Sequence, residues 1–411
     1  MRLNKAKKRI LVVGQYFYPE QFRVNDVCEQ WVNMGYNVEV VAGTPNYPQG
    51  KFYDGYGFLK KTREKHNGIK ISRIPQIPRG SSSFMLSINY LSFVASGFVW
   101  SKLSRKKADL VFNYSTSPIL HALPGIWFAK RKGIPFYIYI LDMWPQSFET
   151  MTNIHFGPII KVLHRICDYI YDNSEKIFIP SKGYIKPLLD RGVPNEKIVY
   201  WPQYAEEYYK PLNPKKVTVP EIPQDGKFNI VFAGNIGYAQ GLEVLPDVAK
   251  RIRENNDNIR LCIVGDGRYK TTLLEQIKEA GVEDVFCFVD RQPATRISDF
   301  MAVCDAALIT LQKTDLFALT IPAKVQSCMA CGIPVVLAVD GVAQTVVREA
   351  ECGLTCASSD AEALYRTMVE MSKKGEKELK EMRKNARAYF ENNFEKNLLM
   401  KKMDEYINKG V

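Results

Sequence analysis

Short apolar runs alternate with amphipathic stretches along almost the whole chain. Runs such as "RILVV" (residues 9–13), "DLVFNY" (109–114) and "FNIVF" (228–232) are nearly continuous, which is typical of strands in a sheet that helices cover on both faces. Between such runs, apolar residues recur at helical spacing, for example over residues 22–35 and 158–174. The pattern predicts an α/β protein built of parallel sheets.

The alternation stops over residues 201–227, which are rich in Pro, Lys and Glu and show no periodicity. We interpret this stretch as a connection between two doubly wound, Rossmann-like domains. The expected boundaries are residues 1–204 for the N-terminal domain, 205–226 for the linker and 227–390 for the C-terminal domain. Residues 391–411 are charged and helical in spacing, and they follow a C-terminal domain that is already complete.

Residues 84–100 depart from the soluble pattern because they contain no charged side chain. Phe84, Leu91 and Phe98 fall on one helical stripe, whereas Asn89 and Ser92 fall on another. Basic residues flank the segment: Arg79, Lys102, Arg105, Lys106 and Lys107. We expect an amphipathic helix over residues 84–104 that lies in the interface of an anionic membrane. A buried domain helix is the alternative, followed by a membrane-spanning one, for which the segment is at the short limit.

The formal net charge of +12 admits nucleic acid, an anionic membrane or anionic substrates as partners. Interleaved basic and aromatic motifs of an RNA-binding kind are absent, so we favour the membrane over nucleic acid. The first ten residues are basic and the next apolar run is short, so we expect no secretory signal and a cytoplasmic protein.

The nine cysteines are scattered, which suits a reducing compartment. Cys328, Cys331, Cys352 and Cys356 have a spacing that resembles a zinc site. The first pair, however, lies in a predicted helix that leads directly into a buried strand, whereas structural zinc ligands usually lie in turns. We therefore expect no metal, and zinc remains the alternative.

"FAGNIGYAQGLEVL", residues 232–245, is a glycine-rich turn between a predicted strand and a predicted helix. Such a turn presents backbone N–H groups to an anion. Neither G-x-G-x-x-G nor G-x-x-x-x-G-K-[ST] fits it. Two cations stand in the first turns of other predicted helices: Arg23 and Lys324. A cation there opposes the helix dipole unless an anion binds nearby; the alternative for Lys324 is that it extends into solvent.

A series of motifs in this order resembles glycosyltransferase family 4, which has the GT-B fold, and in particular its WbuB-like branch of L-fucosamine-type transferases of bacterial surface polysaccharides. The motifs are "YFYPE", "PNYPQGKFYDGYG", "STSP", "LDMWPQS", "PNEKIVYWPQYAEEYY", "FAGNIGYAQGLE", "IVGDG", "TIPAKVQSCMACGIPVV" and the final charged helix. The resemblance implies two domains that face each other across a cleft. It also implies a nucleotide-diphosphate sugar held mostly by the C-terminal domain, an acceptor held by the N-terminal domain, and a last helix that packs on the N-terminal domain.

The resemblance also implies a site. The chain has no Asp-X-Asp pair of the kind that metal-dependent sugar-nucleotide sites of another fold use, so Lys324 and backbone amides around Asn235 are expected to neutralise the leaving diphosphate. The basic pair of the wider family falls here at Asn235 and Gln240, both neutral. The predicted donor-binding residues are Arg23, Gly234, Asn235, Ile236, Gly237, Gln240, Gly265, Arg291, Lys324, Gln326 and Ser327, with Gln326 or Ser327 as candidates for the ribose.

Three residues are predicted to be catalytic: Asp142, His121 and Lys324. Asp142 follows a buried strand at its carboxyl end, where open α/β sheets hold their ligands. A turn cap is the alternative for Asp142, an ordinary helix residue for His121, and an ordinary tight turn for Gly265.

The expected function is metal-independent, retaining transfer of a sugar from a UDP-sugar to a lipid-diphosphate-linked glycan, in capsule, O-antigen or exopolysaccharide synthesis. The first candidate for the sugar is an N-acetylated deoxyhexosamine such as L-FucNAc. No cofactor is expected, and the protein is expected to be peripheral on the inner face of the plasma membrane. The alternatives are a UDP-sugar 2-epimerase-like isomerase of the same fold, and a non-catalytic protein that binds a sugar nucleotide or nucleic acid.

Overall fold

The computed structural model describes residues 8–152 and 157–409, and the chain divides into two compact units. The first unit holds the chain up to Pro180, then Tyr184–Trp201, and the last helix from Met400 onwards. The second unit holds Ser181–Gly183 and Pro202–Leu399. Each unit has its own sheet, so the prediction of two Rossmann-like α/β domains is confirmed.

The first unit is built on an eight-stranded sheet with the order β3-β4-β2-β1-β5-β6-β7-β8. Its strands are β1 (Arg9–Val13), β2 (Asn37–Gly43), β3 (Arg63–His66), β4 (Ile69–Ile74), β5 (Leu110–Ser115), β6 (Phe136–Ile140), β7 (Lys176–Ile179) and β8 (Ile198–Tyr200). All neighbours pair in parallel except β3 and β4, which form an antiparallel pair at the edge. The order of the chain reverses between β1 and β5, and such a switch point is where doubly wound sheets bind ligands.

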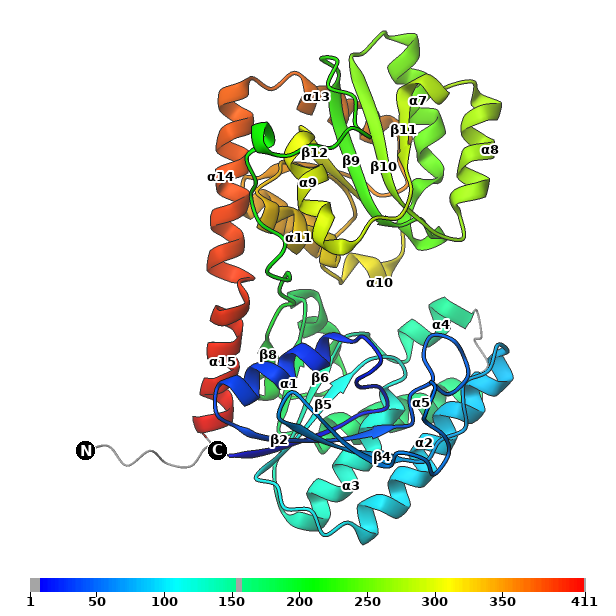
Figure 1. Cartoon of the computed structure of the whole chain (residues 1–411), viewed down its shortest axis with the longest axis vertical. Helices are drawn as coiled ribbons and strands as arrows, with labels where there is room; N and C mark the ends of the chain where they lie inside the picture. Colours follow the sequence, from blue (N-terminus) through cyan, green and yellow to red (C-terminus); the bar gives the residue numbers. More distant parts are fainter. Residues whose placement is uncertain (1–7, 153–156, 410–411) are drawn as a thin grey trace, which may run out of the picture. The chain divides into compact units, whose positions relative to one another are not determined.

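Helices cover both faces of this sheet, with α1 on one face and α2 and α3 on the other (Figure 1). The helices of this unit are α1 (Arg23–Asn33), α2 (Ser83–Leu103), α3 (Leu123–Lys132), α4 (Gln146–Thr152), α5 (Gly157–Asp172), α6 (Ile185–Asp190) and the end of α15 (Lys396–Lys409). The Tyr406 ring of α15 packs edge-on against Phe178 of β7, and the Tyr36 hydroxyl donates to Asp404. The final part of the chain therefore packs on the N-terminal sheet.

The second unit is built on a six-stranded parallel sheet with the order β11-β10-β9-β12-β13-β14. Its strands are β9 (Phe228–Asn235), β10 (Ile259–Asp266), β11 (Phe286–Val289), β12 (Ala306–Thr310), β13 (Val335–Ala338) and β14 (Gly353–Cys356). Counted along the chain, this is the doubly wound order 3-2-1-4-5-6, with its switch point between β9 and β12.

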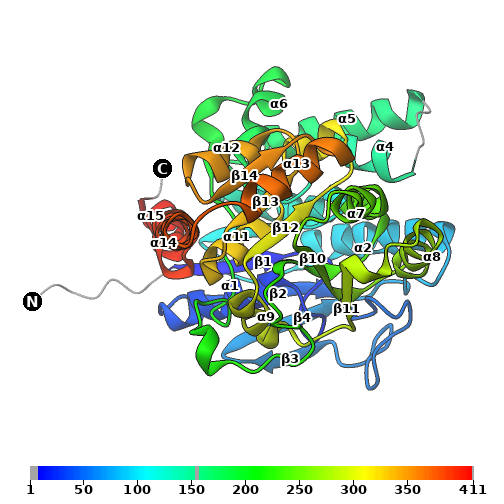
Figure 2. The same cartoon turned by 90° about the horizontal axis from the view of Figure 1, so that it is seen from above.

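The helices of the second unit form two layers, which Figures 1 and 2 show on either side of the sheet. One layer buries apolar residues of α7 (Leu245–Glu254), α8 (Lys270–Ala280) and α13 (Ala361–Ser372). The other buries those of α9 (Ile297–Val303), α11 (Ala323–Cys331), α12 (Val342–Glu349) and α14 (Glu376–Asn393). A short helix, α10 (Asp315–Ala318), precedes α11.

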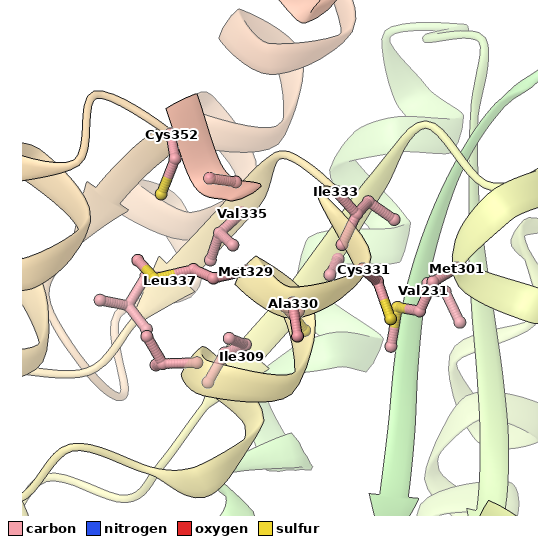
Figure 3. Packing of buried hydrophobic residues seen from close by; sticks show 14 of the residues in the cluster. Val231, Met301, Ile309, Met329, Ala330, Cys331, Ile333, Val335, Leu337 and Cys352 are labelled. Carbon is pink, nitrogen blue, oxygen red and sulfur yellow. The ribbon is translucent and has the colours of Figure 1, made fainter. Parts of the chain in front are cut away.

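The cysteines with zinc-like spacing are part of this core. Cys328, Cys331 and Cys352 are buried in the α11 layer, and Figure 3 shows the last two among apolar side chains such as Val335. Cys356 is buried in the layer on the opposite face of the sheet. Among the residues that the structure describes, no three His, Cys, Asp or Glu side chains are grouped to hold a metal ion. The four cysteines with zinc-like spacing therefore do not meet at one place in the fold.

Residues 205–226, predicted to be a linker, pack against the second unit. Ala205, Val219 and Ile222 are buried in its core, and Asp225 forms an ion pair with Arg260 on β10. The stretch lacks periodicity because it makes these contacts as an irregular strap rather than as a helix or strand.

The predicted amphipathic helix is α2, and its polar and apolar faces are inverted relative to a solvated helix. The face packed on the protein carries Asn89, Phe93, Gly97 and Ser101, which recur every four residues. The opposite face exposes large apolar side chains: Phe84 (74%), Leu91 (61%), Phe98, Val99 and Leu103 (74%). By length and composition α2 could cross a bilayer, and only 17% of its most apolar stretch is buried.

Gly97 explains how α2 can pack closely along α3. A Cβ atom on Gly97 would lie 2.3 Å from the ring of Pro124, so the two helices meet where α2 has no side chain. Because α2 is held against the domain along one face, the structure favours a helix that belongs to the fold and presents its other face outward.

Candidate functional site

Two glycine loops interlock at the carboxyl edge of the second sheet, beside its switch point. The Ile236 N–H donates to the carbonyl of Asp266 (2.8 Å), and the Ile236 carbonyl accepts the N–H of Tyr269 (3.0 Å). A Cβ atom on Gly265 would lie 1.9 Å from the carbonyl oxygen of Gly234. The end of β10 can approach β9 this closely only because residue 265 is a glycine.

Lys324, in the first turn of α11, reaches the β9 loop although 84 residues separate it from Gln240 along the chain. Its Nζ donates to Oε1 of Gln240 and lies 3.6 Å from the centroid of the Phe232 ring. A Cβ atom on Gly234 would lie 2.8 Å from Cε of Lys324, so glycine also leaves room for this side chain. The structure thus brings together the glycine loop and the cation that the sequence placed far apart.

The protonated form of Lys324 is less stable here than it would be in water. Burial lowers its pKa to about 7, because removal from water disfavours the charged ammonium. Within the described part of the chain no carboxylate pairs with Lys324, and the neutral Gln240 amide and the Phe232 ring are its polar and π partners. An anion bound at the β9 loop would stabilise the protonated form, so this lysine is a strong candidate for an anion ligand.

The loop offers fewer free amides than the sequence suggested. The N–H of Ile236 is already bonded to Asp266, and the Ile236 side chain is fully buried, so this residue shapes the loop rather than donating to a ligand. Asn235 is exposed, and its side-chain nitrogen lies against Gly237. The loop is also anchored to β12, because the Thr310 hydroxyl at the end of that strand donates a hydrogen bond to the Gln240 carbonyl (2.6 Å).

The side chains of the two candidates for a ribose contact form hydrogen bonds with the backbone at the start of α11. Gln326 is buried, and its amide nitrogen can donate to the carbonyls of Pro322 (2.9 Å) and Ala323. The Ser327 hydroxyl donates to the carbonyl of Lys324 (3.1 Å). Arg291 is exposed just beyond β11, at the same edge of the sheet. Which of these residues meets a ribose stays a prediction.

His121 lies in the first unit, buried below the switch point. Its Nε2 donates to the carbonyl of Thr116 (2.6 Å), which leaves Nδ1 to accept from the Asn113 amide (3.4 Å). Burial lowers the pKa of the imidazole to about 4, so it is neutral near pH 7. The side chain is only 2% exposed, and this geometry favours a structural role in the turn after β5 over the predicted catalytic one.

Asp142 lies at the carboxyl end of β6 and is partly exposed. Its Oδ2 accepts the hydroxyl of Ser117 (2.7 Å), which in turn accepts the indole N–H of Trp144 (3.1 Å). Ser117 and Trp144 were not predicted as site residues, although they lie in the family motifs "STSP" and "LDMWPQS". Their bonds orient the carboxylate, as expected for a group that contacts a substrate.

Arg23 begins α1 and therefore lies at the carboxyl edge of the N-terminal sheet. Its charge is electrostatically coupled to the buried hydroxyl of Tyr139 on β6. Arg23 belongs to the first unit and Lys324 to the second, so a shared role in donor binding stays a prediction.

Known proteins match both halves of the chain. The model for Glycosyltransferase Family 4 matches residues 22–203, and the model for Glycosyl transferases group 1 matches residues 216–389. The chain is 23% identical over 338 residues to the putative colanic acid biosynthesis glycosyl transferase WcaI of Escherichia coli (strain K12), which covers 79% of this chain and 81% of that protein. It is 24% identical over 217 residues to the putative colanic acid biosynthesis glycosyltransferase WcaL of the same organism, covering 53% of this chain and 52% of that protein.

Solved structures share the fold. HepE from Anabaena, solved in complex with UDP, aligns with a TM-score of 0.70 at 16% identity and covers 98% of this chain and 100% of its own. Sucrose-phosphate synthase from Thermosynechococcus elongatus aligns with a TM-score of 0.74 at 14% identity, covering 98% and 99%. With a family 4 N-terminal half and a group 1 C-terminal half on two doubly wound domains, the chain belongs to the glycosyltransferases with the GT-B fold.

Proposed function

We propose that this glycosyltransferase moves a sugar from a UDP-sugar to a lipid-diphosphate-linked glycan at a membrane surface, with retention of anomeric configuration and without a metal ion. The observation that supports the donor half of this reaction is the partly buried ammonium of Lys324 beneath the glycine loop of β9, a position suited to a diphosphate. HepE, which has the same fold, was solved with UDP and with UDP-glucose, and this supports uridine as the base.

In this mechanism the bond from C1 of the sugar to the diphosphate breaks, and a bond from C1 to the acceptor oxygen forms. The negative charge that develops on the diphosphate is stabilised by Lys324 and by loop amides such as that of Gly237. The proton of the acceptor hydroxyl passes to an oxygen of the departing phosphate. Asp142, oriented by Ser117, binds a hydroxyl of the acceptor or of the transferred sugar.

A donor panel tests this function. UDP-, GDP- and dTDP-sugars, including UDP-L-FucNAc, are offered with undecaprenyl-diphosphate-linked GlcNAc, and products are identified by mass spectrometry with and without EDTA. We expect transfer from a UDP-sugar that is unchanged by EDTA. Complete loss of transfer in EDTA, restored by a divalent metal, would contradict the metal-free mechanism.

The same panel addresses the isomerase alternative. A 2-epimerase would convert a UDP-sugar such as UDP-GlcNAc without any acceptor, whereas a transferase requires one. Conversion in the absence of the lipid-linked acceptor, with no glycan product in its presence, would replace the proposed function. The relatives WcaI and WcaL, both described as colanic acid transferases, favour transfer into a polysaccharide.

The exposed apolar face of α2 supports the membrane location. We expect the double variant Leu91→Ser, Leu103→Ser to bind anionic liposomes at least about tenfold more weakly, because each leucine contributes roughly 1.5–3 kcal/mol when it leaves water. Co-sedimentation with vesicles of phosphatidylglycerol and phosphatidylethanolamine measures this.

Leu189→Ser, Leu274→Ser is the matched control, since these leucines are 43% and 40% exposed but lie outside α2. Both double variants should keep the wild-type melting temperature. Equal vesicle binding by the two would show that α2 is not the membrane contact.

A further inference from the structure

An aromatic cluster lies at the carboxyl edge of the N-terminal sheet, in the motifs "YFYPE" and "PNYPQGKFYDGYG", which the donor site does not use. Tyr16 follows β1, Phe22 immediately precedes α1 and Tyr47 follows β2. Their ring centroids are 5.0 Å (Tyr16 to Phe22), 5.2 Å (Phe22 to Tyr47) and 5.7 Å (Tyr16 to Tyr47) apart. Burial raises the pKa of Tyr16, and the hydroxyl of Tyr90 on α2 lies close enough to that of Tyr16 to raise this pKa further. We call Tyr16, Phe22, Tyr47 and Tyr90 the aromatic platform.

A cation accompanies the platform. The guanidinium of Arg79 lies 4.9 Å from the centroid of the Tyr47 ring, and Arg79 is partly exposed. Arg73 is different, because it is buried and paired with Glu64. In the described ranges Arg79 forms no ion pair, so its charge is available to an anion, which a guanidinium can grip with two parallel hydrogen bonds.

The platform is held in place by buried polar groups. The Glu20 carboxylate is fully buried and accepts the backbone N–H groups of Asn46 (2.9 Å) and Tyr47 (2.8 Å). The Asn46 side chain accepts the N–H of Arg79 (3.0 Å), which joins the segment after β4 to the same loop. A site whose loops are fixed in this way loses little conformational entropy when a ligand binds.

The chemistry of the exposed groups defines the ligand class. Tyr47 is 37% exposed and Phe22 is partly exposed, so each offers surface to a sugar, whose C–H-bearing faces are apolar. Arg79 beside them suits a phosphate attached to that sugar. An aromatic ring next to a guanidinium is therefore better suited to bind a sugar that carries a phosphate or diphosphate than to bind an uncharged sugar.

The platform also adjoins the exposed apolar face of α2. Tyr90 belongs to α2, and the neighbouring residue Asn89 donates to the carbonyl of Ile77, two residues before Arg79. Ile77 and Phe84 on either side of Arg79 are exposed apolar residues. A ligand with its phosphate on Arg79 would thus have an apolar surface beside it for a lipid chain.

We propose that the aromatic platform and Arg79 form the acceptor subsite, which binds the diphosphate and the first sugar of a lipid-linked acceptor. This inference rests on the proposed function, and it assigns the acceptor half of that reaction to these residues. Phe22 and Tyr47 hold the sugar, Arg79 holds the diphosphate, and the lipid chain continues along the apolar face of α2.

The test separates KM for the acceptor from KM for the donor. The variants Arg79→Gln and Tyr47→Leu are assayed with undecaprenyl-diphosphate-linked GlcNAc in nanodiscs and with a water-soluble, short-chain prenyl analogue. We expect each variant to raise the acceptor KM at least about tenfold for both acceptors, since both carry the same diphosphate and sugar. The KM for the donor and the affinity for UDP should stay within about twofold of wild type.

Lys51→Gln and Phe58→Leu are the matched controls, because they remove an exposed cation and an exposed aromatic ring from the same loop region outside the platform. Melting temperatures check that all variants fold. An unchanged acceptor KM in Arg79→Gln or Tyr47→Leu, measured while wild type transfers sugar, would overturn this inference and leave the proposed function intact. No transfer by wild type from any donor would instead overturn the proposed function.

Discussion

Replacing Lys324 by alanine is expected to lower turnover roughly 100-fold or more, the usual cost of removing one electrostatic donor to a developing charge. Lys324 lies directly beneath the β9 loop, with Gln240 and the Phe232 ring as its contacts. Its charge has no carboxylate partner in the described structure, so the diphosphate would be its counter-ion. Steady-state rates at saturating donor and acceptor measure the effect.

The pH dependence of UDP binding provides a second readout for the same residue. The pKa of Lys324 is lowered to about 7, so above pH 7 the free protein must take up a proton before the lysine can meet UDP as a cation. Wild-type affinity for UDP should therefore fall as the pH rises from 7 to 9, approaching about tenfold per pH unit, whereas Lys324→Ala should show no such slope. Calorimetric titration at several pH values measures both proteins.

Lys313→Ala is the control, because Lys313 is an exposed lysine of the same domain just beyond β12. It should keep wild-type turnover and the wild-type pH slope. Wild-type turnover in Lys324→Ala would remove this lysine from the mechanism.

Replacing Gly265 by alanine is expected to abolish measurable UDP binding and to destabilise the C-terminal domain by about 1–3 kcal/mol, the usual cost of overpacking. The new Cβ would lie 1.9 Å from the carbonyl oxygen of Gly234, and a backbone atom of a paired strand cannot rotate away as a side chain can. The β9 loop would have to shift, and Lys324 packs against that loop. Calorimetry with UDP and thermal denaturation measure the two effects.

Gly281→Ala separates loop displacement from the general effect of adding a methyl group. Gly281 ends α8 in the left-handed conformation, and the nearest atom to its Cβ position is 3.8 Å away. This variant should lose stability, by roughly 1 kcal/mol, but bind UDP normally. If Gly265→Ala also bound UDP normally, the interlocked loops would not form the donor site.

The two-domain α/β fold could be predicted because parallel strands buried on both faces leave a plain signal in the sequence. The edge strand β3 left no such signal, because its sequence "REKH" is charged and resembles that of a loop. Charged residues are nevertheless common on exposed edge strands. The strap of residues 205–226 was likewise missed as part of a domain, because Val219 and Ile222 enter the core singly. Irregular packing has no period to detect.

For the site, the resemblance to glycosyltransferase family 4 associated the glycine loop with Lys324, and the rule that parallel sheets bind ligands at their carboxyl edge agrees with that pairing. The rule could not say which polar groups were already engaged. Ile236 uses its N–H within the loop, and His121 bonds to Thr116 in a buried turn. Such partners depend on how loops and turns fold in three dimensions, which no periodicity in the sequence reports. Asp142 gained its orienting neighbour Ser117 for the same reason.

The amide contacts of Asn89 limit how α2 can move. Asn89 accepts from the buried amide of Gln15 (2.8 Å), and Gln15 donates also to Gln76 (3.0 Å). Apolar packing alone would let a helix roll by a fraction of a turn, but these hydrogen bonds form in one rotational setting only. On a lipid surface, a helix held in this way would fix the tilt of the N-terminal domain relative to the membrane. The end of β1 would then stand at a constant height above the headgroups.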